Sequence, residues 1–238
     1  MDDRSGQPLV SVVVVNFNGA AVLDRCLRQL VSQDHPNYEI VLVDDASTDS
    51  SVEIGSRYLS SGKLSIVSNL ANQGCAGARN VGLRHAQGNI VAFVDADGFA
   101  EPHWLRCAAG ALERDPSVGA VASLVFFARN RLVLNGAGGT LNWSGYGGDV
   151  CFQEPYEFAR LPQEILYPMG CGMVVRRAVL DRIGAFDPSF VNYYDDVDLG
   201  IRVWRAGYRV VLAPDAWVDH GYGHSGGPSP LKRSGSRP

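Results

Sequence analysis

The sequence is poor in cysteine, and the cysteines it has are not spaced for metal binding. There are five, and no two of them form a CxxC pair. An odd number of isolated cysteines is typical of reduced thiols in a reducing compartment. We therefore expect free thiols at Cys26, Cys75, Cys107, Cys151 and Cys171.

Long apolar runs and an excess of positive charge are also missing. No apolar run approaches the ~20 residues that a membrane-spanning helix needs. With 21 Lys and Arg against 25 Asp and Glu, the net charge is −4, so no attraction to nucleic acid is expected. The acidic and polar residues 1–5 are unlike a secretory signal. We expect a cytoplasmic protein, with peripheral association at the inner face of the membrane left open and the oligomeric state unknown.

What the chain does contain is an alternation of strand and helix patterns with enough apolar residues for a full core. Of its 238 residues, 46% are hydrophobic, which suffices for one domain or one domain with a subdomain. Repeated strand–helix units imply a parallel sheet with right-handed crossovers. The predicted strands cover residues 10–15, 39–43, 64–67 and 90–94, and the predicted helices cover residues 20–31, 52–59, 75–86 and 102–114.

The second half of the chain is less regular. Residues 118–127 are apolar and predicted to be extended, whereas residues 135–148 are rich in glycine and predicted to form a flexible loop. The composition after Gly221 predicts a disordered tail. Between these segments we expect a strand at 173–175, helices at 178–183 and 196–206, a strand at 208–212 and a strand-like segment at 216–219 that ends at His220.

Two carboxylates, those of Asp95 and Asp97, come directly after the apolar run at residues 90–94. Alternate side chains of an extended segment share a face, so both can point the same way. Such a pair repels by about 4 kcal/mol at an effective dielectric near 20. A divalent cation such as Mg²⁺ removes this repulsion while it binds substrate phosphates. The pair therefore indicates a metal–nucleotide site, although by itself it also fits an ordinary strand-end turn.

Polar residues also follow the first two predicted strands, at the end where ligands bind in parallel sheets. Asn16 and Asn18 follow the first strand, and Asp44 and Asp45 follow the second. An acidic residue after the second strand can accept hydrogen bonds from a base or ribose, or it can cap the next helix. We expect these side chains to meet Asp95 at one edge of the sheet.

Two further segments carry groups that suit anion binding or catalysis. Residues 72–80 place small residues and Arg79 at a helix start, where main-chain N–H groups favour an anion; close packing with a structural ion pair is the alternative. Residues 193–199 hold three aspartates, which fit either a helix N-terminus or a base that deprotonates a hydroxyl. His220 is a candidate metal ligand at the same edge.

In this order, the motifs resemble the family 2 glycosyltransferases with a GT-A fold, and among these the bacterial rhamnosyltransferase-like branch. Each motif is weak alone, but the ordered set is specific and extends from about residue 10 to residue 225. The resemblance implies an α/β fold with a Rossmann-like, mostly parallel central sheet flanked by helices, and a smaller mixed acceptor-side region towards the C-terminus. The stretches that carry it are residues 12–18, 41–49, 72–82, 94–97, 170–177, 183–190, 194–199 and 208–214, with His220.

The resemblance also implies roles for individual residues. Asp95 and Asp97 match the DxD motif that holds Mg²⁺ or Mn²⁺ on the donor diphosphate, and His220 matches a position that completes the metal site. Asp196 matches the catalytic base. The supporting residues on the acceptor side are Asp195, Gly170 and Gly172. The residues expected to bind the donor nucleotide-sugar are Asn16, Asn18, Asp45, Asn72, Gly74, Arg79 and Asp95.

The implied activity is inverting transfer of a sugar from a UDP- or dTDP-sugar to a hydroxyl of a glycan, lipid-linked or small-molecule acceptor. One domain would cover residues 1–225, with a nucleotide-sugar half at about 8–115, an acceptor half at about 116–225, and a disordered tail at 226–238. Two departures from the family pattern concern the acceptor. Asp195 stands where the family usually has Glu, and the chain stops soon after His220, so the acceptor site could be incomplete or completed by a partner.

Two other functional classes remain open from the sequence. A nucleotidyltransferase uses a similar sheet with acidic metal ligands, but it usually carries a glycine-rich loop with Lys or Arg after the first strand, where this chain has residues 16–19, Asn-Phe-Asn-Gly. A non-catalytic module that binds sugar nucleotides or glycans is the other alternative.

Overall fold

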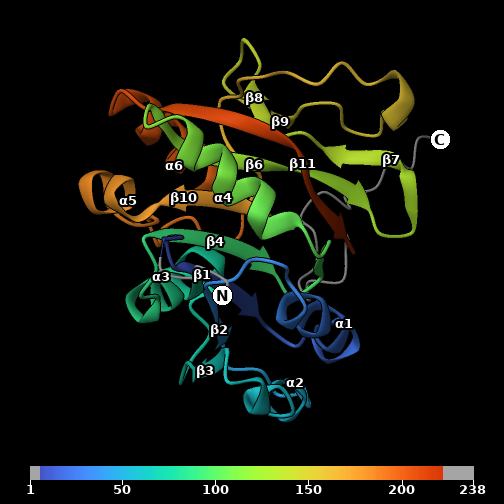
Figure 1. Cartoon of the computed structure of the whole chain (residues 1–238), viewed down its shortest axis with the longest axis vertical. Coiled ribbons are helices and arrows are strands. Elements are labelled where there is room, and N and C mark those ends of the chain that lie inside the picture. The colour runs from blue at the N-terminus through green and yellow to red at the C-terminus, as the bar shows by residue number, and fades with distance from the viewer. Residues whose placement is uncertain (1–5, 222–238) are drawn as a thin grey trace, which may run out of the picture.

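The computed structural model describes residues 6–221, and its first half is a parallel sheet with helices between the strands (Figure 1). The strands lie in the order β3-β2-β1-β4, and each neighbouring pair is parallel. Each predicted strand of this half is present, with boundaries that differ by at most one residue. These strands are β1 (Val10–Asn16), β2 (Tyr38–Asp44), β3 (Leu64–Ser68) and β4 (Ile90–Asp95).

The second half of the chain continues the same sheet. β10 (Met173–Arg176) pairs antiparallel with β4 and with β6 (Val118–Phe127), and β11 (Arg209–His220) runs parallel to β6. The short β5 (Gly98–Ala100) and β7 (Asn130–Gly136) add antiparallel strands to β11 and β6. Among the described residues the sheet has nine strands, most of them running in one direction. The carboxyl ends of β1, β2, β4, β6 and β11 therefore meet at one edge, together with the start of β10.

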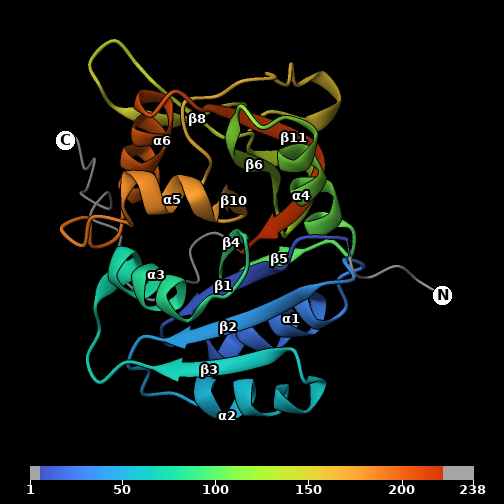
Figure 2. The same cartoon turned by 60° about the vertical axis from the view of Figure 1, so that its left-hand side comes forward.

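Helices cover both faces of the sheet, and the alternation of side chains along the strands explains the two layers. Val12 and Val14 of β1 belong to one hydrophobic cluster, and Val13 between them belongs to the other. Figure 2 shows α1 and α3 on opposite sides of the sheet. The first cluster includes side chains of α1 (Ala20–Val31), α2 (Ser51–Ser56) and α4 (Trp104–Arg114). The second includes side chains of α3 (Gly74–His85), α5 (Arg177–Ile183) and α6 (Asp195–Arg205).

The structure corrects the predicted flexible loop at residues 135–148. These residues end β7 and form the hairpin of β8 (Gly139–Leu141) and β9 (Gly147–Asp149), and Asn135 and Ala137 are fully buried. The sequence signal failed because β6 and β9 supply main-chain hydrogen-bond partners that a local glycine count cannot reveal.

Two other predicted boundaries were wrong. The strand predicted at 208–212 and the strand-like segment predicted at 216–219 form one strand that ends at His220, and a register shift between Ala213 and Trp217 accommodates Pro214. The helix predicted at 52–59 ends at Ser56. The described residues also contain the short 3₁₀ helices η1 (Leu59–Ser61) and η2 (Tyr156–Phe158). The predicted tail at 226–238 lies outside the described residues. None of the described helices has the length and apolar character to cross a membrane.

Candidate active site

At the carboxyl edge of the sheet, the structure brings Asp97 and His220 together from opposite ends of the chain. Asp97 lies in the turn after β4, and His220 ends β11. The Nε2 atom of His220 is 3.3 Å from Oδ1 of Asp97, and its Nδ1 atom is 2.7 Å from Oδ1 of Asn135. Because the Asn135 oxygen accepts a hydrogen bond, Nδ1 carries a proton and Nε2 points to the acidic side. Although burial opposes the charged form, the carboxylates of Asp97 and Asp95 raise the pKa of His220.

Arg79 joins this acidic edge to the start of α6. Arg79 is 3% exposed, and its guanidinium binds Asp95 at 3.0 Å and also Asp195. Burial opposes its charge, but Asp195 and Asp95 together raise the pKa of Arg79. Gly170 leaves room for this arrangement, since a Cβ there would lie 2.5 Å from Nη2 of Arg79. Of the two roles that the sequence allowed for Arg79, the structure shows contact with carboxylates; its proposed contact with the donor stays a prediction.

Asp196 lies next to Asp195, the ion-pair partner of Arg79, and is half-buried at the N-terminus of α6. Its carboxylate accepts main-chain hydrogen bonds from Gly170 at 3.1 Å and from Val197 at 2.8 Å. Burial, followed by the negative charge of Asp195, raises the pKa of Asp196 to about 6. A carboxylate with this pKa can hold a proton near neutral pH, which suits a general base.

A second group of predicted residues lies at the ends of β1 and β2. The buried Asp45 accepts main-chain hydrogen bonds from Gln73 and Gly74, each at 3.0 Å, and so anchors the start of α3. Asn72 donates to the main-chain oxygen of Asp45 at 3.3 Å. These contacts explain the local structure, and the contact of Asp45 with a donor base remains a prediction.

Two asparagines that were predicted to bind the donor form hydrogen bonds with the end of β2 and the loop that follows it. Asn16 is buried and donates to Asp44 at 2.9 Å, whereas Asn18 is exposed and accepts from the main chain of Thr48 at 2.8 Å. Gly172 is different, because it has φ +95° and its main-chain oxygen accepts from Ser123. That φ favours glycine, so the position has a structural reason independent of any acceptor.

Sequence reasoning missed three side chains that surround the site: Asn135, Asp149 and Tyr167. Burial and then the charges of Asp149 and Asp196 raise the pKa of Tyr167, which places this phenol near both carboxylates. Burial raises the pKa of Asp149, and His220 opposes the shift. The only signal was the glycine-rich composition of residues 135–148, which was interpreted as a loop and which includes Asn135 but neither Asp149 nor Tyr167. These residues connect the His220 end of the site to the Asp196 end.

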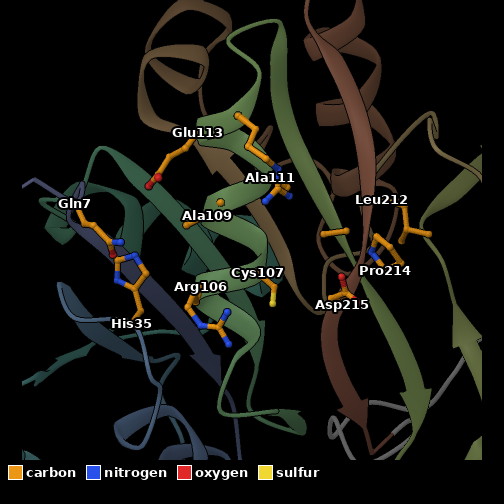
Figure 3. Close-up of a pocket in the computed structure, with 13 residues that line it drawn as sticks. Gln7, His35, Arg106, Cys107, Ala109, Ala111, Glu113, Leu212, Pro214 and Asp215 are labelled. Carbon is orange, nitrogen blue, oxygen red and sulfur yellow. The ribbon is translucent and has the colours of Figure 1, made fainter.

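A separate cavity of about 410 Å³ contains none of the predicted site residues (Figure 3). It lies along α4, where Arg106, Cys107 and Glu113 line it, and Pro214 and Asp215 line its other side. The candidate active site is therefore the edge of the sheet and not this cavity, since the convergent carboxylates and imidazole lie at the edge.

The mostly parallel sheet, with acidic and imidazole side chains at its carboxyl edge, defines an α/β fold of the GT-A type. A family model described as glycosyl transferase family 2 matches residues 11–184. The chain belongs to this family. A glycosyltransferase of Nostoc sp. is 30% identical over 180 residues, which cover 75% of this chain and 54% of the relative. The chain thus spans about half the length of that relative.

Two solved structures share the fold. The mannosyltransferase PcManGT from Pyrobaculum calidifontis, in complex with GDP-Man and Mn²⁺, has a TM-score of 0.66 at 26% identity and is matched over 90% of this chain and 57% of its own. GalNAc-T7 with UDP, GalNAc and Mn²⁺ has a TM-score of 0.75 at 20% identity, over 90% of this chain and 44% of its own. The second likeness concerns the fold alone. Together they confirm the predicted GT-A architecture.

Proposed function

We propose that the chain transfers a sugar from a nucleoside-diphosphate sugar to an acceptor hydroxyl in a single inverting displacement. The observation that carries this proposal is the position of Asp196, a carboxylate with a raised pKa, beside the chain of contacts from Asp195 through Arg79 to Asp95. A base and a diphosphate-binding edge at one site are what such a transfer needs. The complex of the Pyrobaculum mannosyltransferase with GDP-Man and Mn²⁺ supports a nucleoside-diphosphate sugar as donor.

The donor set at the edge fits a divalent cation. Carboxylate oxygens suit Mg²⁺ and Mn²⁺, and the Nε2 atom of His220 already lies close to Asp97. We assign Asp95, Asp97 and His220 as the residues that would hold Mg²⁺ or Mn²⁺. When bound, the cation would neutralise charge on the departing diphosphate.

Asp196 would take the proton from the attacking hydroxyl. Its two main-chain hydrogen bonds fix the carboxylate, and its raised pKa improves the match to a proton acceptor working near neutral pH. Asp195, Gly170 and Gly172 would support the acceptor side. The donor nucleotide-sugar would contact the edge formed by Asn16, Asn18, Asp45, Asn72, Gly74, Arg79 and Asp95.

We further propose that the donor is a UDP- or dTDP-sugar. Transfer of rhamnose is the first activity to test. The acceptor class is a glycan, a lipid-linked sugar or a small molecule. Residues 1–225 are proposed as one domain, and the single sheet that passes through both halves supports this within the described residues.

The proposal is tested by incubating the protein with Mn²⁺, a panel of nucleotide-sugars and a panel of acceptors, and measuring nucleoside diphosphate release. Release that requires both Mn²⁺ and an acceptor supports sugar transfer. Pyrophosphate release from a nucleoside triphosphate would instead indicate a nucleotidyltransferase, and donor binding without release would indicate a binding module.

A further inference from the structure

One cysteine lies at the edge that the proposed function uses, although that function gives it no role. Ligand atoms of Asp95, Cys171 and His220 all lie within 4.8 Å of one another. The three residues come from the end of β4, the segment before β10 and the end of β11. A carboxylate, a thiol and an imidazole therefore converge from three separate parts of the chain.

The fold explains why Cys171 reaches this place. β10 runs antiparallel to β4, with Met173 opposite Phe93, so the residues just before β10 lie beside the end of β4. A Cβ built on Gly98 would lie 2.8 Å from the Cys171 sulfur, which shows how closely the thiol packs under the turn after Asp95. Cys171 is 3% exposed, so the sulfur faces the interior of this turn and not solvent.

The chemistry of this donor set differs from that of an all-oxygen site. Thiolate and imidazole ligands favour Zn²⁺, whereas carboxylates and water suit Mg²⁺ and Mn²⁺. A tetrahedral Zn²⁺ lies about 2.0–2.3 Å from each ligand atom, so its ligand atoms are about 3.5 Å apart. The three side chains would have to close by little more than about an ångström from their present spacing.

The environment of His220 supports the same geometry. Asn135 accepts from Nδ1 at 2.7 Å, so Nε2 points to the acidic side, where it lies 3.3 Å from Oδ1 of Asp97. One carboxylate oxygen of Asp95 binds Arg79 at 3.0 Å, and a carboxylate has a second oxygen for a metal. Each of the three residues can therefore offer one ligand atom, and a cation bound to Nε2 would replace the contact between His220 and Asp97.

We propose that Asp95, Cys171 and His220 form a thiolate-containing site for Zn²⁺. This site shares Asp95 and His220 with the cation site of the proposed function, so Zn²⁺ and Mg²⁺ or Mn²⁺ exclude each other. The competition rests on the proposed function, whereas binding of Zn²⁺ through the Cys171 sulfur rests on the geometry alone.

The test uses Co²⁺ as a spectroscopic substitute for Zn²⁺ on the full chain after treatment with a chelator. A cobalt–thiolate bond gives a charge-transfer absorption band in the near ultraviolet. We expect this band in the wild type, its removal by added Zn²⁺, and its loss in Cys171→Ser and Cys171→Ala. We also expect Zn²⁺ affinity to fall in both variants by at least the roughly 10–100-fold that loss of an outer-shell partner costs.

Cys26→Ser is the matched control. Cys26 is fully buried and its sulfur lies 3.9 Å from the main-chain oxygen of Asp95, but it is not part of the ligand group. This variant should keep the band. Circular dichroism of all variants confirms that the fold is retained, and the wild-type spectrum tests the idea without any substitution.

Three results would overturn the inference: no Co²⁺ binding by the wild type, Co²⁺ binding without the band, or an undiminished band in folded Cys171→Ser. A parallel titration of the wild type with UDP and Mn²⁺ separates the two proposals. A cobalt band without Mn²⁺-dependent nucleotide binding would leave the zinc site standing and count against sugar transfer, and the reverse pattern would remove the zinc site alone.

Discussion

Asp196 is the side chain on which the proposed chemistry depends most. Asp196→Asn keeps the size of the side chain and removes its basicity, so we expect the rate of transfer to fall by about 10²–10⁴-fold. Binding of the donor should change little, because Asp196 contacts main-chain groups of Gly170 and Val197 and none of the proposed cation ligands. Steady-state kinetics together with donor titration would check this, and wild-type turnover by the variant would remove Asp196 from the mechanism.

The raised pKa of Asp196 also predicts the acid side of the pH profile. The base works in its deprotonated form, and burial raises its pKa to about 6, so the protonated and inactive fraction grows as the pH falls through that value. We expect kcat/KM for the acceptor to decline below about pH 6 and to level above it. A profile that stays flat down to about pH 4, the range of an ordinary aspartate, would contradict this environment for the base.

Substitution of Arg79 tests the buried ion pairs with Asp95 and Asp195. Arg79→Met leaves the carboxylates of Asp95 and Asp195 without their shared partner, and breaking a buried ion pair in this way costs about 3–5 kcal/mol. The control is Arg106→Met, because Arg106 is exposed and its 3.0 Å pair with Asp34 is worth about 1 kcal/mol or less. Urea unfolding of both variants measures the difference, and equal losses would contradict a structural role for the bridge.

At the scale of elements, the contact between α3 and the sheet requires a glycine. A Cβ at Gly82 would lie 2.2 Å from Cγ1 of Val13 in β1, so Gly82→Ala must push helix and sheet apart. We expect a net loss of about 1–2 kcal/mol, since overpacking costs about 1–3 kcal/mol and exceeds the helix propensity gained.

Gly110→Ala in α4 is the matched control for Gly82→Ala. A Cβ there would meet only the end of the Arg114 side chain, at 3.5 Å. Gly110→Ala should therefore stabilise the protein by about 0.5–1 kcal/mol, as expected for alanine in a helix. Thermal unfolding of the two variants should shift in opposite directions, and a stabilised Gly82→Ala would show that α3 is less closely packed than described.

The elements also show which features the sequence could predict. The ends of β1, β2 and β4 followed from apolar runs that stop at Asn16, Asp44 and Asp95, because the period of a buried strand is a local property. β7, β8 and β9 were not predicted, because β7 is held by pairing with β6 and β8 by pairing with β9, and the glycine-rich composition of these residues does not indicate such pairs. The two parts of β11, at 208–212 and 216–219, were predicted separately, and pairing with β6 on both sides of the irregularity near Pro214 joins them into one strand.

At the scale of the whole molecule, the sequence predicted which edge of the sheet holds the candidate site. It predicted the contacts within that site less well. The direction of parallel strands is enough to bring Asp97 and His220 to one edge. The roles of Asn135, Asp149 and Tyr167 depend on side-chain packing between β7, β9 and the segment before β10, which no local pattern specifies. Arg79 was placed at the right helix, but its two carboxylate partners could be identified only in three dimensions.

The proposed activity depends on a cation that joins the acidic edge of the sheet to a nucleoside diphosphate. The most direct measurement is calorimetric titration of UDP, dTDP and GDP with and without Mn²⁺, on the wild type, Asp97→Asn and Asp196→Asn. We predict that Mn²⁺ strengthens binding of at least one nucleotide by about tenfold or more, equivalent to about 1.4 kcal/mol, in the wild type and in Asp196→Asn but not in Asp97→Asn. Equal affinity with and without Mn²⁺, or an undiminished Mn²⁺ effect in Asp97→Asn, would contradict it.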